Sequence, residues 1–224
     1  MNSRKSVLLV GFVSMLMIPP AVRAQGTLAK SSAPHSEAAA ILKQDMRKLW
    51  TDHVVWTRDY IIAATEKLPD APSALNRLMK NQEDIGAAVA KYYGDAAGRQ
   101  LTTLLKDHIA IAGDIVKAAL AGDKTGQKAA DGRWRQNATQ IADFLSKANP
   151  NLPRATLLNM MNMHLSTTSA ELVARLNKDW DGDVKAFDAV YDHILQMSDA
   201  LSDGIVKQFP DKFGHRAVGT TGRR

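Results

Sequence analysis

The sequence predicts an all-α protein, an up-down bundle of five long helices plus a short broken helical pair. Apolar residues recur at three- and four-residue steps along most of the chain, which is the period of an amphipathic helix. Strand-like alternation is absent, and the short connections between the predicted helices favour antiparallel neighbours. These patterns indicate one helical domain, residues 36–210, between a polar linker, residues 25–35, and a flexible basic tail, residues 211–224.

The first 24 residues have the pattern of a secretory signal peptide. A polar start with Arg4 and Lys5 precedes the apolar run SVLLVGFVSMLM, and AVRA supplies small residues for cleavage after Ala24. The apolar run is too short to span a bilayer, and no other segment reaches that length, so we expect no membrane span after signal removal. Because the chain also has no Cys for a lipid anchor or a disulfide, we expect a periplasmic or secreted protein.

The predicted helices begin and end at capping and breaking residues. Ser36 caps the first helix, and the segment LPDAP ends it near Lys67. Two short pieces follow, separated by a break at Asn81. The last helix ends before Pro210. In order, the remaining elements are predicted at residues 72–80, 82–93, 96–121, 125–148, 153–178 and 184–208, with the segment Trp180–Asp183 as the turn before the last helix.

The charge of the chain argues against a nucleic-acid partner. The formal net charge is +6, but the signal peptide holds Arg4, Lys5 and Arg23 and no acid. The tail is basic as well, so the helical body is neutral and has no basic stripe for phosphate contacts. Motifs of di-iron carboxylate proteins, HExxH metalloproteases and phosphate-binding loops are absent. No catalytic residue is therefore predicted, and whether the protein is an enzyme stays open.

Four histidines lie close to the midpoints of four predicted helices: His53, His108, His164 and His193. Each is within about 4–5 Å of its midpoint along the helix axis. In an antiparallel bundle the midpoints share one level, so the four imidazoles can form a layer. His53, His108 and His193 lie on apolar faces, whereas the face of His164 is mixed. His35 and His215 fall in the predicted linker and tail.

This layer has two interpretations. In the first, the four histidines bind a transition metal such as copper, zinc or iron, or contribute to a small-ligand site. In the second, the protein is a structural, interaction or stress protein, and a buried layer of His, Asn and Thr only determines helix packing. A third reading, a hydrolase using His164 with Ser166 or Ser169, has the least support. Residues expected near the site, as ligand contacts or supporting groups, are Trp56, Thr57, Arg58, Asn137, Met160, Thr168 and Met197.

Methionine spacing bears on the choice of metal. Met160 and His164 are one helical turn apart, as are His193 and Met197. Thioether and imidazole together suit copper, although methionine is equally common as a filler of helical cores. Arg58, beside Trp56, marks either the mouth of a ligand site or a surface ion pair next to a core tryptophan.

Four segments carry a family resemblance: LWTDHVVWTRDYIIA, LLKDHIAIAGDIVKAA, RWRQNATQIADFLSKANPNLP and HILQMSDALSDGIVKQFPDKF. Through the motifs WxxHVxWTR, KxHIxIA, WxxNAxxIAxFLS and QFPxKF, the chain resembles a family of uncharacterised bacterial helical-bundle proteins. The match spans about residues 49–213. Some members are called glycosyltransferase or acetylglutamate kinase, activities that the helical pattern here does not support. The resemblance implies that the four mid-helix histidines, Arg58 and Asn137 belong to the family pattern, and it implies no activity.

Overall fold

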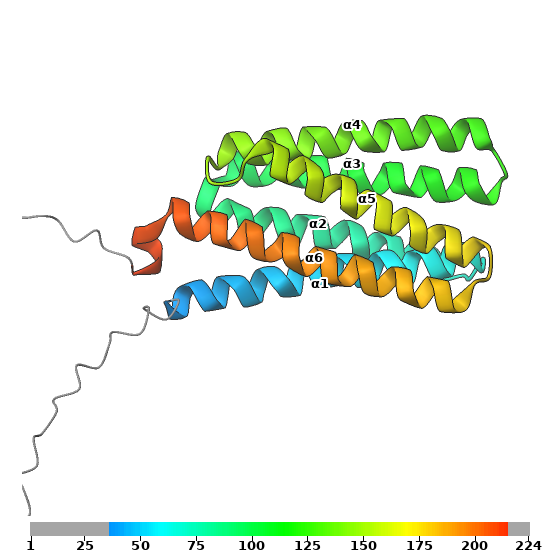
Figure 1. Ribbon diagram of the computed structural model, residues 1–224, viewed down its shortest axis with the longest axis horizontal. Helices are drawn as coiled ribbons and strands as arrows, with labels where there is room; N and C mark the ends of the chain where they lie inside the picture. The colour runs from blue at the N-terminus through cyan, green and yellow to red at the C-terminus, as the bar shows by residue number, and fades with distance from the viewer. Residues whose placement is uncertain (1–35, 215–224) are drawn as a thin grey trace, which may run out of the picture. The chain divides into compact units, whose positions relative to one another are not determined.

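The computed structural model describes residues 36–214 and confirms an all-helical bundle (Figure 1). Each helix packs against the next along the chain, and the last packs against the first, so the helices form a closed ring around the core. None of the helices in the described region is long and apolar enough to cross a membrane. The elements are α1 (Glu37–Thr65), α2 (Ala71–Tyr93), α3 (Asp95–Leu120), α4 (Lys124–Ala148), α5 (Arg154–Leu176), α6 (Trp180–Gln208) and the short 3-10 helix η1 (Pro210–Phe213).

The predicted signal peptide and linker, residues 1–35, lie outside the described residues, as do residues 215–224 with His215. The predicted tail begins inside the folded domain, because its first residues belong to η1. Phe213 is buried and its ring stacks on Tyr92 at a centroid distance of 5.8 Å. The helical domain therefore extends past the predicted boundary at residue 210, and the aromatic contact is the reason.

Side-chain caps explain where several helices begin. Ser36 caps α1 as predicted, with the backbone N–H of Ala39 donating to its Oγ at 3.3 Å. Asp179 caps α6 in the same way, accepting from the backbone N–H of Gly182 at 3.0 Å. Because of this cap, the segment Trp180–Asp183 is the first turn of α6, and the prediction of a separate turn there was wrong.

The predicted break at Asn81 was also wrong, because α2 is one continuous helix. Asparagine has a weak intrinsic preference for helices, which made it a reasonable breaking point. In the structure its side chain is fully buried and donates from Nδ2 to the carbonyl oxygen of Leu49 on α1 at 3.0 Å. This tertiary hydrogen bond outweighs the local preference, so the short broken pair is replaced by a sixth long helix.

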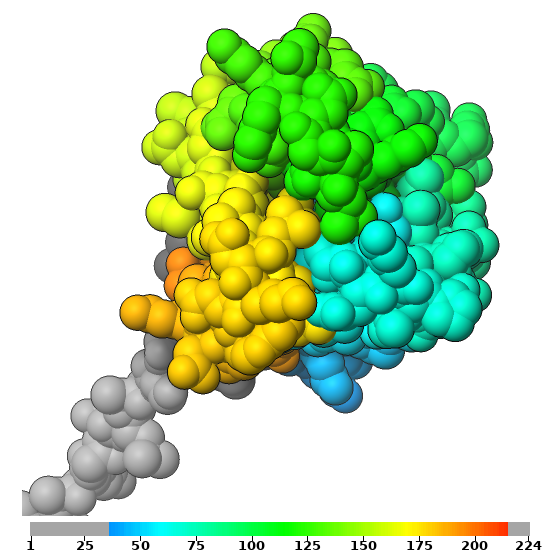
Figure 2. Space-filling view, turned by 90° about the vertical axis from the view of Figure 1, so that its right-hand side faces the viewer, coloured from blue at the N-terminus to red at the C-terminus, as the bar shows by residue number. Residues whose placement is uncertain are grey.

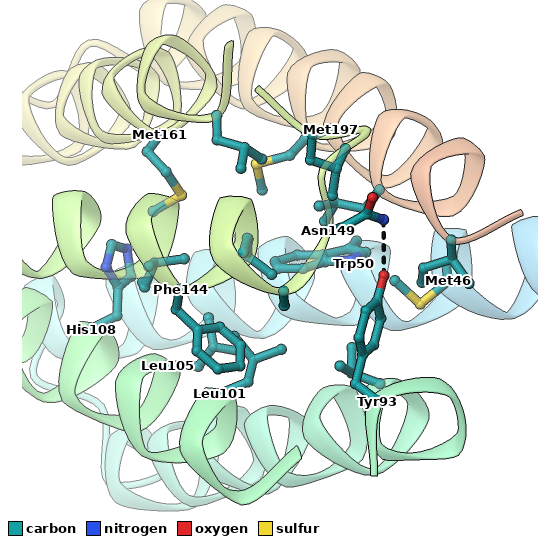
Figure 3. Close-up of a pocket in the computed structure, with 18 of the residues that line it drawn as sticks. Met46, Trp50, Tyr93, Leu101, Leu105, His108, Phe144, Asn149, Met161 and Met197 are labelled. Atoms are coloured by element: carbon teal, nitrogen blue, oxygen red, sulfur yellow. Dashed lines mark hydrogen bonds between the residues drawn. The ribbon is translucent and has the colours of Figure 1, made fainter. Parts of the chain in front are cut away.

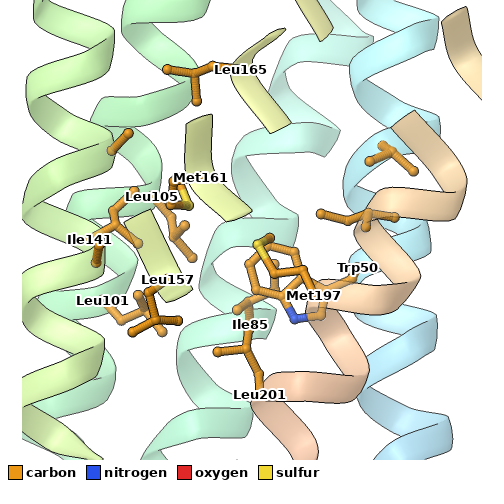
Figure 4. Packing of buried hydrophobic residues seen from close by; sticks show 14 of the residues in the cluster. Trp50, Ile85, Leu101, Leu105, Ile141, Leu157, Met161, Leu165, Met197 and Leu201 are labelled. Atoms are coloured by element: carbon orange, nitrogen blue, oxygen red, sulfur yellow. The ribbon is translucent and has the colours of Figure 1, made fainter. Parts of the chain in front are cut away.

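The core fills the space inside the ring of helices (Figure 4). Figure 2 shows the end of the bundle where the connections 66–70, 121–123 and 177–179 lie, which is the right-hand end of Figure 1. The side chains of these connections gather closely there, so the interior is covered from this side. The core side chains labelled in Figure 4 are Trp50, Ile85, Leu101, Leu105, Ile141, Leu157, Met161, Leu165, Met197 and Leu201.

Close contact between α2 and α3 depends on two facing glycines. A Cβ on Gly86 would lie 2.7 Å from the carbonyl oxygen of Gly98. We expect Gly86→Ala to lower the free energy of unfolding by about 1–3 kcal/mol, because the two backbones must separate. Gly132, on α4, is a matched control, since a Cβ there meets nothing within 4 Å. In urea unfolding, Gly132→Ala should stabilise the protein by about 0.5–1 kcal/mol. Equal effects of the two substitutions would contradict the close packing.

Candidate functional site

The four mid-helix imidazoles come together in the core. His164 on α5 is the centre of the group, with ring centroids 5.6 Å from His53, 6.0 Å from His108 and 6.4 Å from His193. His53, His108 and His164 are buried, with 2%, 2% and 4% of their surface exposed. His193 is only half-buried. The sequence indicated an apolar face for His193 and a mixed face for His164. His164 is nevertheless the more buried of the two, because its polar neighbours on α5 are themselves buried.

Three hydrogen bonds hold this layer, and each joins a pair of consecutive helices. His53 on α1 meets Gln82 on α2 at 3.2 Å, and His108 on α3 meets Asn137 on α4 at 2.7 Å. His193 on α6 meets the backbone carbonyl of Met160 on α5 at 2.9 Å. Every one of the long helices therefore contributes a group to one polar layer. We name the four histidines with Gln82 and Asn137 the imidazole layer.

The amide of Asn137 determines where His108 carries its proton. Its Nδ2 donates to the backbone carbonyl of Leu104 at 3.0 Å, so its Oδ1 faces His108 and accepts. The Nδ1 of His108 must then be the N–H, and its Nε2 holds a lone pair. This Nε2 is buried and has no hydrogen-bond partner among residues 36–214. One uncommitted lone pair therefore lies inside the core.

The other three rings differ in which of their nitrogens make hydrogen bonds. Gln82 donates from Nε2 to the carbonyl of Leu78 at 2.8 Å, so its nitrogen faces His53 and the Nδ1 of His53 accepts. His193 donates from Nε2 to the carbonyl of Met160. In His164, by contrast, Nδ1 is buried and finds no partner within the described part of the chain. Such buried unsatisfied nitrogens are rare in folded proteins and indicate a function, an ion or a water.

Burial keeps the inner imidazoles neutral. Desolvation lowers the pKa of His53 to about 3, and repulsion from His108 adds to the effect. Desolvation lowers the pKa of His108 to about 4, against a smaller opposing effect of the bond to Asn137. The pKa of His164 is lowered well below 6.5 by desolvation, and repulsion from the three neighbouring histidines lowers it further. Neutral imidazole is the form that coordinates metal ions.

An apolar cavity of about 40 Å³ adjoins the layer. His53, His108 and His164 line it together with Met46, Met161 and Met197. In Figure 3, His108 lies at one end of the cavity with Met161 on the same side, and the hydrogen bond from Asn149 Nδ2 to Tyr93 Oη, 2.9 Å long, lies at the other end. A space of this size holds a few water molecules or an ion.

One sequence prediction about methionine changes here. Met160 was expected to share a face with His164. In the structure its backbone carbonyl contacts the imidazole layer by accepting a hydrogen bond from His193. Met161, three residues before His164, reaches the cavity instead, because positions three apart on a helix are neighbours as well. Met197 lines the cavity as a side chain one turn after His193. The three-residue spacing between Met161 and His164 could have identified Met161. Gln82 could not be identified, because the sequence analysis broke α2 into two short helices at Asn81.

The hydrogen bonds of the four rings bear on which of them could ligate a metal ion. Within residues 36–214, no group of three or more His, Cys, Asp or Glu side chains is arranged to hold a metal ion. The Nδ1 of His53 and the Nε2 of His193 are committed to hydrogen bonds. The pair with free, buried nitrogens is His108 and His164.

Arg58 belongs to a second buried polar cluster. It donates from Nη1 to Glu171 Oε1 at 2.8 Å and forms a two-point bond to Asp183 at 3.0 and 2.9 Å. Arg175 also reaches Asp183, at 3.4 Å. We name Arg58, Glu171, Arg175 and Asp183 the carboxylate cluster. Arg58 therefore pairs with acids from α5 and α6, and the predicted surface ion pair beside a core tryptophan was wrong.

The remaining predicted residues have ordinary surroundings. Trp56 is half-buried, with Arg77 over its ring at 5.4 Å. Thr57 donates to the backbone carbonyl of His53 at 2.7 Å, which is a local helix contact. Thr168 is buried and lines a second apolar cavity of about 40 Å³. Ser166 is exposed while His164 faces the core, so these two side chains do not support a hydrolase reading.

Residues 36–214 thus form a six-helix bundle in which four imidazoles lie in one layer, and His53, His108 and His164 are buried and neutral. No protein-family model, no curated protein and no solved structure matches this chain. The resemblance to the bacterial helical-bundle family therefore stays a prediction.

Proposed function

We propose that the protein binds one copper(I) ion in its interior, between the imidazoles of His108 and His164, with the thioether of Met161 as a third ligand. The observation that carries this proposal is the pair of buried, unpartnered ring nitrogens, His108 Nε2 and His164 Nδ1, on side chains that line one apolar cavity. Burial keeps both rings in the neutral form that coordinates a metal.

The donor set favours copper(I) over the other metals considered. Soft thioether and imidazole ligands select copper(I), whereas zinc usually takes four ligands that include thiolate, carboxylate or further imidazoles. The separation of the rings also fits a shared ion. Two imidazoles bound to one ion at about 2.0–2.1 Å have centroids about 5–6.5 Å apart, and those of His108 and His164 are 6.0 Å apart.

Asn137 is the positioning residue of this site. By accepting from Nδ1–H of His108, it turns the lone pair of that ring onto Nε2. Supporting hydrogen bonds of this kind orient ligating histidines, and their loss typically weakens metal affinity 10–100-fold.

The arrangement of the helices supports the same interpretation. We infer that consecutive helices alternate in direction, since they are joined by short connections and pack pairwise. That order puts residues from the middle of every helix at one level. We further infer that the protein acts in the periplasm or outside the cell, as its N-terminal segment indicates.

The alternative is a purely structural imidazole layer. It is favoured by the hydrogen bonds that His53 and His193 make to neighbouring helices, which can specify helix pairing without any ligand. In that case substitutions in the layer change stability and no ion is bound.

An anaerobic copper(I) titration of protein purified without a histidine tag distinguishes copper binding from a purely structural layer. We expect one equivalent to bind to the wild type, and His164→Leu to weaken binding by more than about 100-fold. Because the Nδ1 of His164 has no partner among the described residues, the apolar replacement should leave the fold intact. Asn137→Ala should weaken binding about 10–100-fold, and His193→Leu is the matched control with little change. No stoichiometric copper, or equal binding by His164→Leu, would contradict the proposal.

A further inference from the structure

The carboxylate cluster contains a buried acid that its ion pairs do not satisfy. Glu171 has 1% of its surface exposed, and Arg58 bonds only its Oε1. Its Oε2 is buried and has no hydrogen-bond partner in the part of the chain that the structure describes. A buried carboxylate oxygen without a donor favours the protonated acid, because the charged form loses its hydration.

The charges that surround Glu171 come from three helices. Arg58 on α1 bonds it directly, Asp183 on α6 shares that guanidinium, and Arg175 on α5 pairs with Asp183. Arg175 also lies 3.4 Å from Glu66, in the connection after α1. With Glu66 counted, two guanidinium groups thus face three acids, and neutral Glu171 balances the charges of the carboxylate cluster and Glu66. Consistently, burial raises the pKa of Glu171 to about 7, against a weaker lowering by Arg58.

Glu171 and His164 lie on the same buried face of α5, two helical turns apart, or about 10 Å along the axis. Thr168 lies between them, and its buried Oγ1 likewise has no partner among residues 36–214. The proposed copper site itself contains only neutral donors, so a bound cation would bring an uncompensated charge into the core.

We propose that Glu171 is the proton-exchanging group of the copper site: its carboxyl O–H releases a proton to solvent when copper(I) binds, and takes one back when the ion leaves. One positive charge enters and one leaves, so the charge of the interior does not change. The proton reaches solvent beside Arg58, whose side chain is 19% exposed. This inference rests on the proposed function.

The size of the coupling follows from the separation. At about 10 Å and an effective dielectric constant of about 20, two unit charges shift an equilibrium about tenfold. A bound ion therefore lowers the pKa of Glu171 by about one unit, and ionised Glu171 tightens copper binding about tenfold. The inner histidines stay neutral over this range, because the pKa values of His53 and His108 are lowered to about 3 and about 4.

The test measures copper(I) affinity between pH 6 and pH 8.5, by competition with a chelator whose own affinity is constant there. Wild-type affinity should rise about fivefold across this range, and at pH 8.5 it should be about tenfold above that of Glu171→Gln. The Glu171→Gln affinity should not change with pH. Glu37→Gln is the matched control, because it removes an exposed acid outside the carboxylate cluster, in the first turn of α1, and should keep the wild-type pH dependence.

Calorimetry of the wild type alone gives a second measurement that does not depend on the fold of any variant. At pH 6.5, titrations in buffers of different ionisation enthalpy should show proton release on copper binding. Binding without proton release, or an unchanged pH dependence in Glu171→Gln, overturns the role of Glu171 and leaves the copper site standing. Absence of copper binding at every pH overturns the site and this inference together.

Discussion

The free energy of unfolding is expected to fall steeply as the pH drops below 6.5. The pKa values of His53, His108 and His164 are all lowered in the folded protein, mainly by desolvation. Below pH 6.5 the unfolded chain protonates these rings while the folded protein does not. The unfolded state then binds more protons, so stability falls as the pH falls toward the folded pKa values.

Glu171 has the opposite effect on how stability changes with pH. Burial raises its pKa to about 7, so between about pH 4.5 and 7 the folded protein holds a proton that the unfolded chain has lost. Three histidines against one glutamate leave a net uptake of about two protons on unfolding between pH 5 and 6. The expected slope is about 3 kcal/mol per pH unit.

Urea unfolding at a series of pH values measures this slope. In His164→Leu, one fewer buried imidazole should reduce it by about 1.4 kcal/mol per pH unit, whatever the absolute stability of the variant. A wild-type stability that is constant between pH 5 and 6.5 would show that the inner rings are hydrated or already charged.

Arg58→Met should be among the most destabilising substitutions in the protein. It leaves Glu171 and Asp183, with 1% and 2% of their surface exposed, without their shared guanidinium. Removing one partner of a buried ion pair typically costs about 3–5 kcal/mol. The guanidinium of Arg58 lies over the ring of Phe187 at 4.6 Å, and methionine retains an apolar side chain there. The loss of stability therefore measures the removal of the positive charge rather than of the packing.

Arg47→Met is the matched control for this measurement. Arg47 makes a two-point bond to Asp199 that is shorter than the contacts of Arg58, at 2.6 Å for each contact, but its side chain is 47% exposed. Exposed ion pairs are screened by solvent and contribute little to stability, so we expect a small loss for Arg47→Met. Chemical unfolding at pH 8 should separate the two variants clearly. Similar losses would mean that the carboxylate cluster is hydrated.

The sequence predicted the position of the imidazole layer better than it predicted which ring nitrogens are free. Helix period and short connections were sufficient to put the midpoints of the helices at one level, and the four rings do meet. Ring orientation depends on partners from other helices, such as Gln82 and Asn137, and helical period carries no information about rotamers. For that reason the sequence could not separate the hydrogen-bonded Nδ1 of His53 and Nε2 of His193 from the unpartnered Nε2 of His108 and Nδ1 of His164.

The carboxylate cluster could not be predicted for a similar reason. Arg58 is 113 positions from Glu171 and 125 positions from Asp183, and the three residues lie on three helices. Each looks like an ordinary surface charge in its own helix. Their burial follows from how α1, α5 and α6 pack, and only the pairing within the bundle reveals it. The misassigned break at Asn81 has the same origin, a bond to another helix.

The most direct test of the imidazole layer is ¹⁵N NMR of the histidine side chains, recorded between pH 5.5 and 8 and again with copper(I). We predict that His108 keeps its proton on Nδ1 and an open lone pair on Nε2 throughout, and that copper(I) shifts the Nε2 signal of His108 and the Nδ1 signal of His164. Ordinary titration of these rings near pH 6.5, with no response to copper(I), would contradict the account.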